Sequence, residues 1–176
     1  MKKFMFCALL CLGLCLSSML AKAQVIYRAT PIAITAVPTV CVNQFNQDFP
    51  DKPGATWEKH TASGTVSNLD KIHFVVRFNH ETRATRARYR DNGQGVSVIT
   101  FLGVQIPDNI RAKAASLYPG FVLTSGERIK SVSKGQEVYR LRFRVRAAKR
   151  VAYFDEQGNE LKLANLDSSL TLEDGQ

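Results

Sequence analysis

Residues 138–146 constrain the fold more than any other segment, because from Tyr139 onward apolar side chains alternate strictly with arginine. They read Val-Tyr-Arg-Leu-Arg-Phe-Arg-Val-Arg. Successive side chains of a β-strand point to opposite faces of its sheet. The alternation therefore predicts a strand with one apolar face on a core and an opposite face carrying four guanidinium groups. These belong to Arg140, Arg142, Arg144 and Arg146.

Residues 1–23 are typical of an export signal. Two lysines precede an apolar run of 13 residues, 4–16. Small residues then stand at the two positions that a signal peptidase recognises, so we expect cleavage near Ala23 and a periplasmic or secreted protein. The run is short for a membrane span, so an uncleaved signal would be the one membrane attachment that we expect.

Removal of the signal leaves Cys41 as the one cysteine, since the other three lie within residues 1–23. An internal disulfide is therefore excluded in the mature chain. Cys41, Phe45 and Phe49 follow one another at four-residue spacing, which predicts a short amphipathic helix. We expect the thiol to be buried on the apolar side of this helix rather than to serve as a redox site.

Charge is unevenly distributed along the chain. Residues 72–150 hold 16 basic and five acidic residues, whereas residues 151–176 hold one basic and six acidic residues. The chain is thus a basic block followed by an acidic end. Because the block contains so few acids, we expect its positive charge to be poorly neutralised by its own carboxylates.

The same order of features occurs twice. A helix, an aromatic residue followed by proline, alternating strands and an acidic turn with glycine run through residues 41–103 and again through residues 104–163. This duplication predicts an α+β fold of two tandem repeats, each a helix packed on an antiparallel sheet of about four strands. Residues 24–40 are expected to be an extended lead-in and residues 164–176 an acidic tail.

The repeated motifs resemble those of the PepSY-like family of exported bacterial proteins, over residues 41–163. The resemblance implies a fold like that of the β-lactamase inhibitor protein, with tandem units joined into a curved surface, and a non-enzymatic binding or inhibitory module. The chain differs from the family in a long loop, 60–71, and in its density of arginine. The motifs are Phe45-(x)3-Phe49-Pro50, Trp57-Glu58, Tyr89-x-Asp91-x-Gly93, Ile106-Pro107, Tyr118-Pro119-Gly120, Tyr139-x-Leu141-x-Phe143 and Phe154-Asp155-Glu156-Gln157-Gly158.

The arginine face is the candidate binding site. The segments 72–78 and 85–90 alternate like 138–146, so their arginines would share a surface with those of the later strand if the sheets are continuous. Guanidinium groups bind carboxylate, phosphate and sulfate through paired hydrogen bonds. The candidate face comprises Arg77, Arg86, Arg88, Arg90, Arg140, Arg142, Arg144 and Arg146.

Three functions fit such a face. It could bind an anionic protein surface, including that of an enzyme which the protein inhibits. It could bind an anionic envelope polymer or lipid headgroup. It could also be the solvated side of a structural module, since half-exposed antiparallel sheets are polar outward by default, with the acidic tail folded back over it. Nucleic acid is disfavoured by export and by the lack of exposed aromatic residues interleaved with the arginines, since the aromatic residues of these strands fall on the apolar faces.

No catalytic, metal or cofactor site is predicted. His60, His73 and His80 match no metal-site spacing. The sequence also has no nucleophile elbow, zinc-protease helix motif or phosphate loop. We therefore expect a binding protein without enzymatic activity, metal or cofactor.

Overall fold

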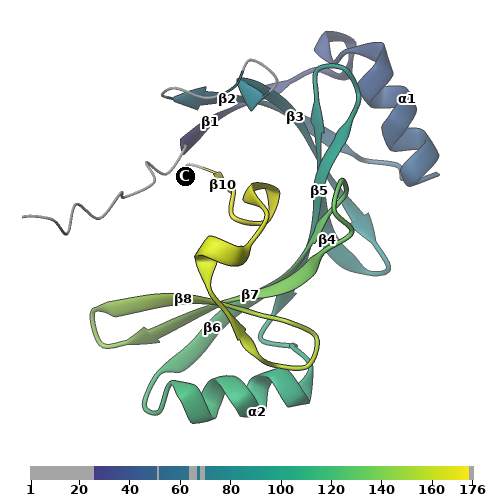
Figure 1. Cartoon of the computed structure of the whole chain (residues 1–176). Helices are drawn as coiled ribbons and strands as arrows, with labels where there is room; N and C mark the ends of the chain where they lie inside the picture. Colours follow the sequence, from purple (N-terminus) through teal and green to yellow (C-terminus); the bar gives the residue numbers. More distant parts are fainter. Residues whose placement is uncertain (1–25, 51, 64–66, 68–69, 175–176) are drawn as a thin grey trace, which may run out of the picture.

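The computed structural model describes residues 26–174 apart from 51, 64–66 and 68–69, so the expected export signal lies outside the described residues. One strongly curved β-sheet forms the body of the protein, and two helices lie on its outer, convex side (Figure 1). The order of its strands is β10-β1-β2-β3-β4-β5-β6-β7-β8-β9. All neighbouring strands are antiparallel except the pair β1 and β10.

The long strands follow the chain order across the sheet. They are β1 (Ile26–Ile32), β2 (Thr56–Ser63), β3 (Ile72–His80), β4 (Arg83–Arg90), β5 (Gly95–Gly103), β6 (Val122–Ser131), β7 (Glu137–Val145) and β8 (Ala148–Phe154). The two edges are short strands, β9 (Glu160–Leu161) and β10 (Glu173–Asp174). The helices are α1 (Thr39–Asp48) and α2 (Asp108–Leu117), with 3-10 turns η1 (Ile34–Ala36), η3 (Leu163–Asn165) and η4 (Ser168–Leu170).

The prediction of two tandem repeats, each a helix on its own sheet of about four strands, is wrong. β5 pairs directly with β6, with Ile99 opposite Ile129, so one continuous sheet crosses the expected boundary. Within the described residues the two α-helices have ten residues each, and the protein is mostly β. Side-chain alternation predicts strands and their faces, but it does not say which strands pair with each other.

α1 covers the outer face of β2, β3 and β4. The Phe45 ring meets the rings of Trp57 and Phe78 edge-on, with centroids 5.6 and 5.0 Å apart. One turn earlier, Cys41 is fully buried, and its thiol donates a hydrogen bond to the carbonyl oxygen of Arg90 at 3.1 Å. The expectation of a buried structural thiol is therefore confirmed.

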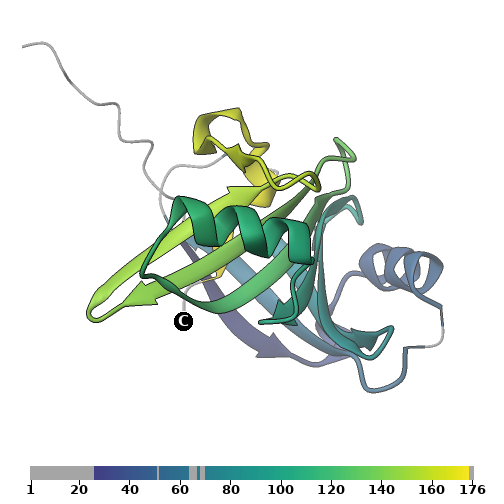
Figure 2. The ribbon, with the colours of Figure 1, turned by 90° about the horizontal axis from the view of Figure 1, so that it is seen from below.

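α2 lies across the outer face of β7 and β8 (Figure 2). Its buried residues Ile110 and Ala114 belong to a core cluster that includes Leu141 and Phe143 of β7. These β7 side chains are the apolar half of the arginine alternation, so the apolar face of this strand packs on a helix and a core, as the sequence predicts. The arginines of β7 consequently face the concave side of the sheet.

The concave side is crossed by the C-terminal segment (Figure 1). After β9 the chain passes through η3 and η4 and ends in β10, which pairs with β1 at the opposite edge of the sheet. The segment expected to be an acidic tail, with folding back over the arginine face as one alternative, bridges the two edges of the curved sheet. Irregular pairing in β4, β5 and β6 accompanies the curvature, since bulges bend and twist strands.

A continuous sheet predicts that both halves of the protein unfold together. Replacing the fully buried Ile110 of α2 by alanine should lower the free energy of unfolding by about 2–5 kcal/mol through lost packing and a cavity. The fluorescence of Trp57, in β2, should give the same urea midpoint as far-UV circular dichroism, both in the unmodified protein and in the variant.

The matched control is Leu117→Ala on the same helix, where the side chain is 50% exposed. This change should alter the free energy of unfolding by less than about 0.5 kcal/mol. Two separate transitions, with the Trp57 signal unmoved by Ile110→Ala, would show that the halves fold independently and would contradict a single cooperative sheet.

Candidate functional site

The concave face of the sheet carries seven of the eight predicted arginines. Arg146 is the exception, because it lies in the β7–β8 turn with a φ of 50°. Strands β5 and β6 separate the two groups, and their residues Ile99 and Ile129 lie between them. The arginines of this face are Arg77 of β3, Arg86, Arg88 and Arg90 of β4, and Arg140, Arg142 and Arg144 of β7.

A buried carboxylate organises the β7 arginines. Glu127 of β6 accepts a hydrogen bond from Nε of Arg140 at 2.6 Å, and Nη1 of Arg142 lies 2.9 Å from the same oxygen, Oε2. The Glu127 and Arg140 side chains are 5% and 3% exposed, whereas Arg142 is 35% exposed. Burial alone would lower the pKa of Arg140, but the Glu127 carboxylate outweighs it and raises that pKa above its usual value.

A second carboxylate holds the arginine of β3. Glu58 of β2 accepts hydrogen bonds from Nε and Nη2 of Arg77 at 2.8 and 3.1 Å, and Nε2 of His60 lies 2.8 Å from it. Burial alone would raise the pKa of Glu58, but the bonds to Arg77 and His60 outweigh it and hold the pKa below its usual range. Glu58 is therefore a carboxylate that fixes Arg77 on the face.

A third carboxylate, Asp70, stands before β3. It lies 3.0 Å from Nε and 2.9 Å from Nη2 of Arg90, and it accepts a further hydrogen bond from Ser67 at 2.7 Å. Burial would raise the pKa of Asp70, but the bonds from Ser67 and Arg90 lower it below its usual value.

Next to this pair, Arg88 and His73 are buried together. Nη1 of Arg88 lies 3.2 Å from Nδ1 of His73, and the ring of Tyr27 stacks on His73 with centroids 4.9 Å apart. The Arg88 guanidinium also lies over the Tyr27 ring, 5.1 Å from its centroid. Burial, with the adjacent Arg88 charge, lowers the pKa of His73 to about 4, so the imidazole is neutral at pH 7.

These contacts correct the expectation that the basic block is poorly neutralised. Glu58 and Asp70 lie outside residues 72–150, yet each pairs with an arginine inside that block. Counting charges in a sequence window missed them because the partners come from a neighbouring strand and a preceding turn. The arginine face is a network of ion pairs rather than an array of isolated charges.

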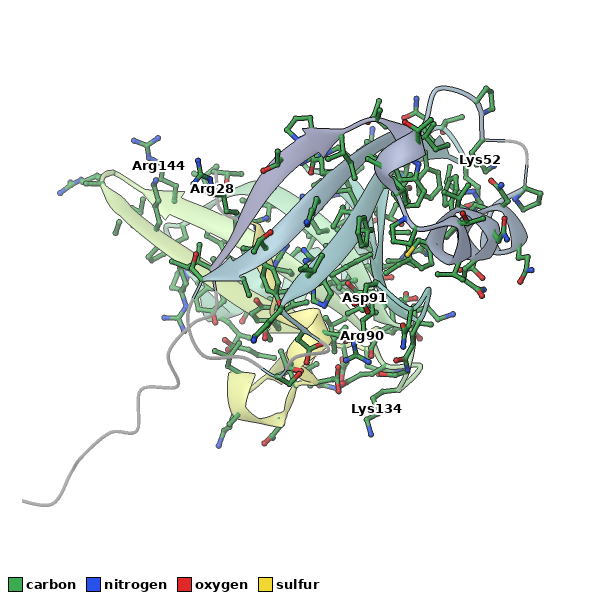
Figure 3. The ribbon with its side chains drawn as sticks, turned by 90° about the horizontal axis from the view of Figure 1, so that it is seen from above. Arg28, Lys52, Arg90, Asp91, Lys134 and Arg144 are labelled. Carbon is green, nitrogen blue, oxygen red and sulfur yellow. The ribbon has the colours of Figure 1, made fainter. Side chains whose placement is uncertain are left out.

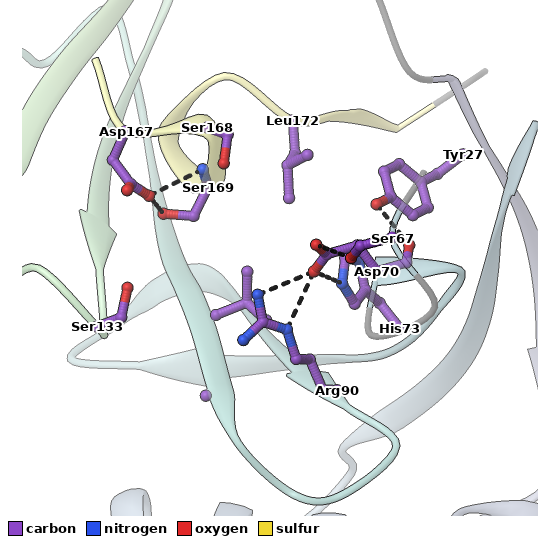
Figure 4. Close-up of a pocket in the computed structure, with 12 residues that line it drawn as sticks. Tyr27, Ser67, Asp70, His73, Arg90, Ser133, Asp167, Ser168, Ser169 and Leu172 are labelled. Carbon is purple, nitrogen blue, oxygen red and sulfur yellow. Dashed lines mark hydrogen bonds and ion pairs between the residues drawn. The ribbon is translucent and has the colours of Figure 1, made fainter. Parts of the chain in front are cut away.

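A pocket of about 250 Å³ lies between the sheet and the C-terminal segment (Figure 4). Asp70, His73 and Arg90 line it from the sheet, and Asp167 and Ser169 line it from the C-terminal segment. This pocket could not be predicted from the sequence, because its two walls come from segments about 100 residues apart that share no motif.

The arginines differ in exposure along the face. Arg88 and Arg140 are buried, at 3% and 2% exposure, and belong to the interior. In contrast, the Arg77 side chain is 45% exposed and Arg144 is exposed near the tip of the β7–β8 hairpin (Figure 3). The Arg86 guanidinium lies over the ring of Phe101, 4.7 Å from its centroid. Accessible guanidinium groups therefore occur in both groups of the face, at Arg77 of β3 and at Arg144 of β7.

Comparison with solved structures supports a fold like that of the β-lactamase inhibitor protein (BLIP). A DUF2874 family protein from Bacteroides ovatus aligns with a TM-score of 0.59 and 16% identity, over 72% of this chain and 85% of that one. A BLIP-like protein from Bacteroides fragilis aligns with a TM-score of 0.58 and 14% identity, over 75% and 90% of the two chains. A candidate periplasmic protein from Bacteroides eggerthii aligns with a TM-score of 0.58 and 14% identity, over 72% and 86%.

At these identities the comparisons show the fold alone. No protein-family model matches the sequence, and no curated protein matches it significantly. The resemblance to the PepSY-like family therefore stays a prediction. Across the part of the chain that the structure describes, no helix is long and apolar enough to cross a membrane.

Loss of the buried carboxylate should destabilise the protein strongly. Glu127→Gln would leave the buried Arg140 without its compensating charge, and the expected loss in the free energy of unfolding is about 3–5 kcal/mol, measured by urea denaturation. The control Glu81→Gln, at a side chain that is 76% exposed, should stay within about 0.5 kcal/mol. Equal stability of the two variants would show that the Glu127 pairs are not part of the folded core.

His73 should make stability fall on mild acidification. Its pKa is about 4 in the folded protein and about 6.5 in the unfolded chain, so the unfolded state binds a proton that the folded state does not. Its contribution is complete above pH 6.5 and is lost as the pH falls towards 4, with a slope of up to about 1.4 kcal/mol per pH unit. Urea titrations of His73→Asn should show a shallower slope between pH 6.5 and 4.5; an unchanged slope would exclude a buried neutral histidine.

Proposed function

We propose that this protein is an exported, non-enzymatic binding protein that holds an anionic partner on the uncovered part of its concave face. The observation that carries the proposal is the exposure of Arg77, Arg142 and Arg144 on one side of a curved sheet, beside buried arginines that belong to the interior. The BLIP-like fold is compatible with a binding module. Export is supported by the pattern of residues 1–23.

The ion pairs prepare the exposed arginines for binding. Arg77 and Arg142 are each held by a glutamate on a neighbouring strand, so their side chains lose little further conformational freedom when a ligand binds. A guanidinium has five N–H donors, and a single carboxylate does not use all of them. A surface with an excess of one charge also speeds the encounter with an oppositely charged partner.

The partner that we favour is an acidic protein surface. A curved sheet with fixed arginine forks recognises carboxylates by geometry as well as by charge. Inhibition would follow if the partner is an enzyme whose active site the bound protein covers. An anionic envelope polymer or lipid headgroup would use the same guanidinium groups but would need no matching protein surface.

The test compares two double variants with the same loss of charge. Arg142→Gln with Arg144→Gln removes exposed arginines from the concave face, and Glu127 keeps Arg140 as its partner. Arg111→Gln with Lys113→Gln removes two exposed cations from α2 on the outer face. Each variant is crosslinked to its partners in native envelope at low and at high salt, and the captured partners are quantified.

The concave-face variant should recover at least tenfold less partner at low salt than the unmodified protein, and the α2 variant should recover the same amount. Recovery by the unmodified protein should also fall steeply with salt, because exposed ion pairs are screened. Equal recovery by the two variants would reject the concave face as the binding site. Retention on an anionic matrix, with no protein captured, would favour the polymer over the protein partner.

A further inference from the structure

The C-terminal segment 163–172, which we call the strap, lies on the concave face in the manner of a bound peptide. Its Leu170 is fully buried and packs in a cluster with Ile99, Ile129 and Val138 of the concave face. These three residues come from β5, β6 and β7, so they form an apolar floor between the two groups of arginines. Leu170 is the anchor of the strap on this floor.

Polar contacts flank the anchor on both sides. Before it, the Ser169 hydroxyl donates to the Ser131 hydroxyl at 2.9 Å, and Ser131 lies 3.3 Å from a carboxylate oxygen of Asp167. After it, Nη1 of Arg140 donates to the main-chain oxygen of Leu172 at 3.4 Å. The face therefore contacts a leucine, a carboxylate and the main chain of one continuous segment.

The strap also has the charge that the face favours. Residues 163–176 contain three acidic residues and no basic residue. The face opposite carries seven arginines, and Glu58, Asp70 and Glu127 are among the carboxylates that pair with them. An acidic segment thus lies on an arginine-bearing face.

The strap buries few of its side chains. Leu163 at its start is 61% exposed, and among its described side chains Ser169 and Leu170 are the buried ones. Among the described residues beyond Leu172, the chain pairs with β1 at Glu173 and Asp174. Segments with few buried contacts open at lower free energy than the core does, so the strap is suited to exchange.

We infer that the concave face is a groove for acidic peptide segments with a leucine anchor, and that the strap is its tethered competitor. This inference rests on the proposed function and specifies its partner: a protein segment that places a leucine on the floor made by Ile99, Ile129 and Val138. The main chain of the segment meets Arg140, and a carboxylate near its leucine meets the Ser131 hydroxyl, as Leu172 and Asp167 do in the strap. Such a partner binds when the strap leaves.

The experiment cuts the strap from the folded protein. A protease site is inserted after the exposed Lys162, the full chain is folded, and the site is then cleaved. The probe is a fluorescent synthetic peptide with the sequence of residues 163–176, and its binding is followed by anisotropy. The cut protein should bind this peptide saturably and at least tenfold more tightly than the uncut protein does.

Two peptide variants distinguish specific binding through Leu170 from non-specific binding. A peptide with Leu170→Asp should bind at least tenfold more weakly, because the aspartate would enter an apolar floor. A peptide with Leu163→Asp carries the same change at an exposed leucine and should bind like the original. An intact protein carrying Leu170→Ala should bind the original peptide more tightly than the unmodified protein does, because its own strap is weakened.

Several results would overturn the inference. They are a cut protein that stays folded but binds no peptide, equal binding of the two aspartate peptides, equal affinity of cut and uncut protein, or loss of the fold on cleavage. The last result would make the strap a permanent part of the core. If the cut protein binds no peptide but Arg142→Gln with Arg144→Gln still lowers partner capture, this inference alone is rejected. If the cut protein binds the peptide but the double variant captures as much partner as the unmodified protein, the proposed partner site is rejected.

Discussion

The buried Glu127 is the interaction on which the arginine face depends. Like charges on neighbouring strands repel, and a guanidinium inside a protein is costly unless an acid compensates it. One oxygen of Glu127 meets both Arg140 and Arg142, whereas Glu58 holds Arg77 and Asp70 holds Arg90. The carboxylates therefore let a single sheet carry this many arginines on one side. They also fix the exposed guanidinium groups in place. The same ion pairs therefore stabilise the fold and position the groups that we propose bind a partner.

Curvature and the strap together give this face its form. The two helices pack on the convex side and leave the concave side to the arginines and to the C-terminal segment. On that side the strap contacts the buried Arg140, whereas Arg77 and Arg144 are exposed. The strap and a binding partner would thus use the same concave face, so that the presence of one restricts the binding of the other.

Local features of the fold could be predicted from the sequence, and tertiary pairings could not. Alternation along β7 placed Leu141 against a helix and Arg142 on the opposite face, because the period of a strand determines both. It failed at Arg146, where the chain has already turned. The pairing of β5 with β6, which replaces two separate repeats by one sheet, has no local signature in the sequence. Likewise, Glu58 and Leu170 look like ordinary strand and tail residues until their distant partners are known.

The central claim, that the strap occupies the arginine face, is tested most directly by a disulfide across the contact. Ser131 and Ser169 touch through their hydroxyl groups at 2.9 Å, so the pair Ser131→Cys and Ser169→Cys should crosslink readily under mild oxidation, while the buried Cys41 stays unreactive. The control is the pair Ser125→Cys and Ser169→Cys, because Ser125 lies towards the other end of β6. The account predicts a disulfide in the first pair and none in the second, measured by mass spectrometry of the folded protein. Equal crosslinking of the two pairs, or none in either, would contradict it.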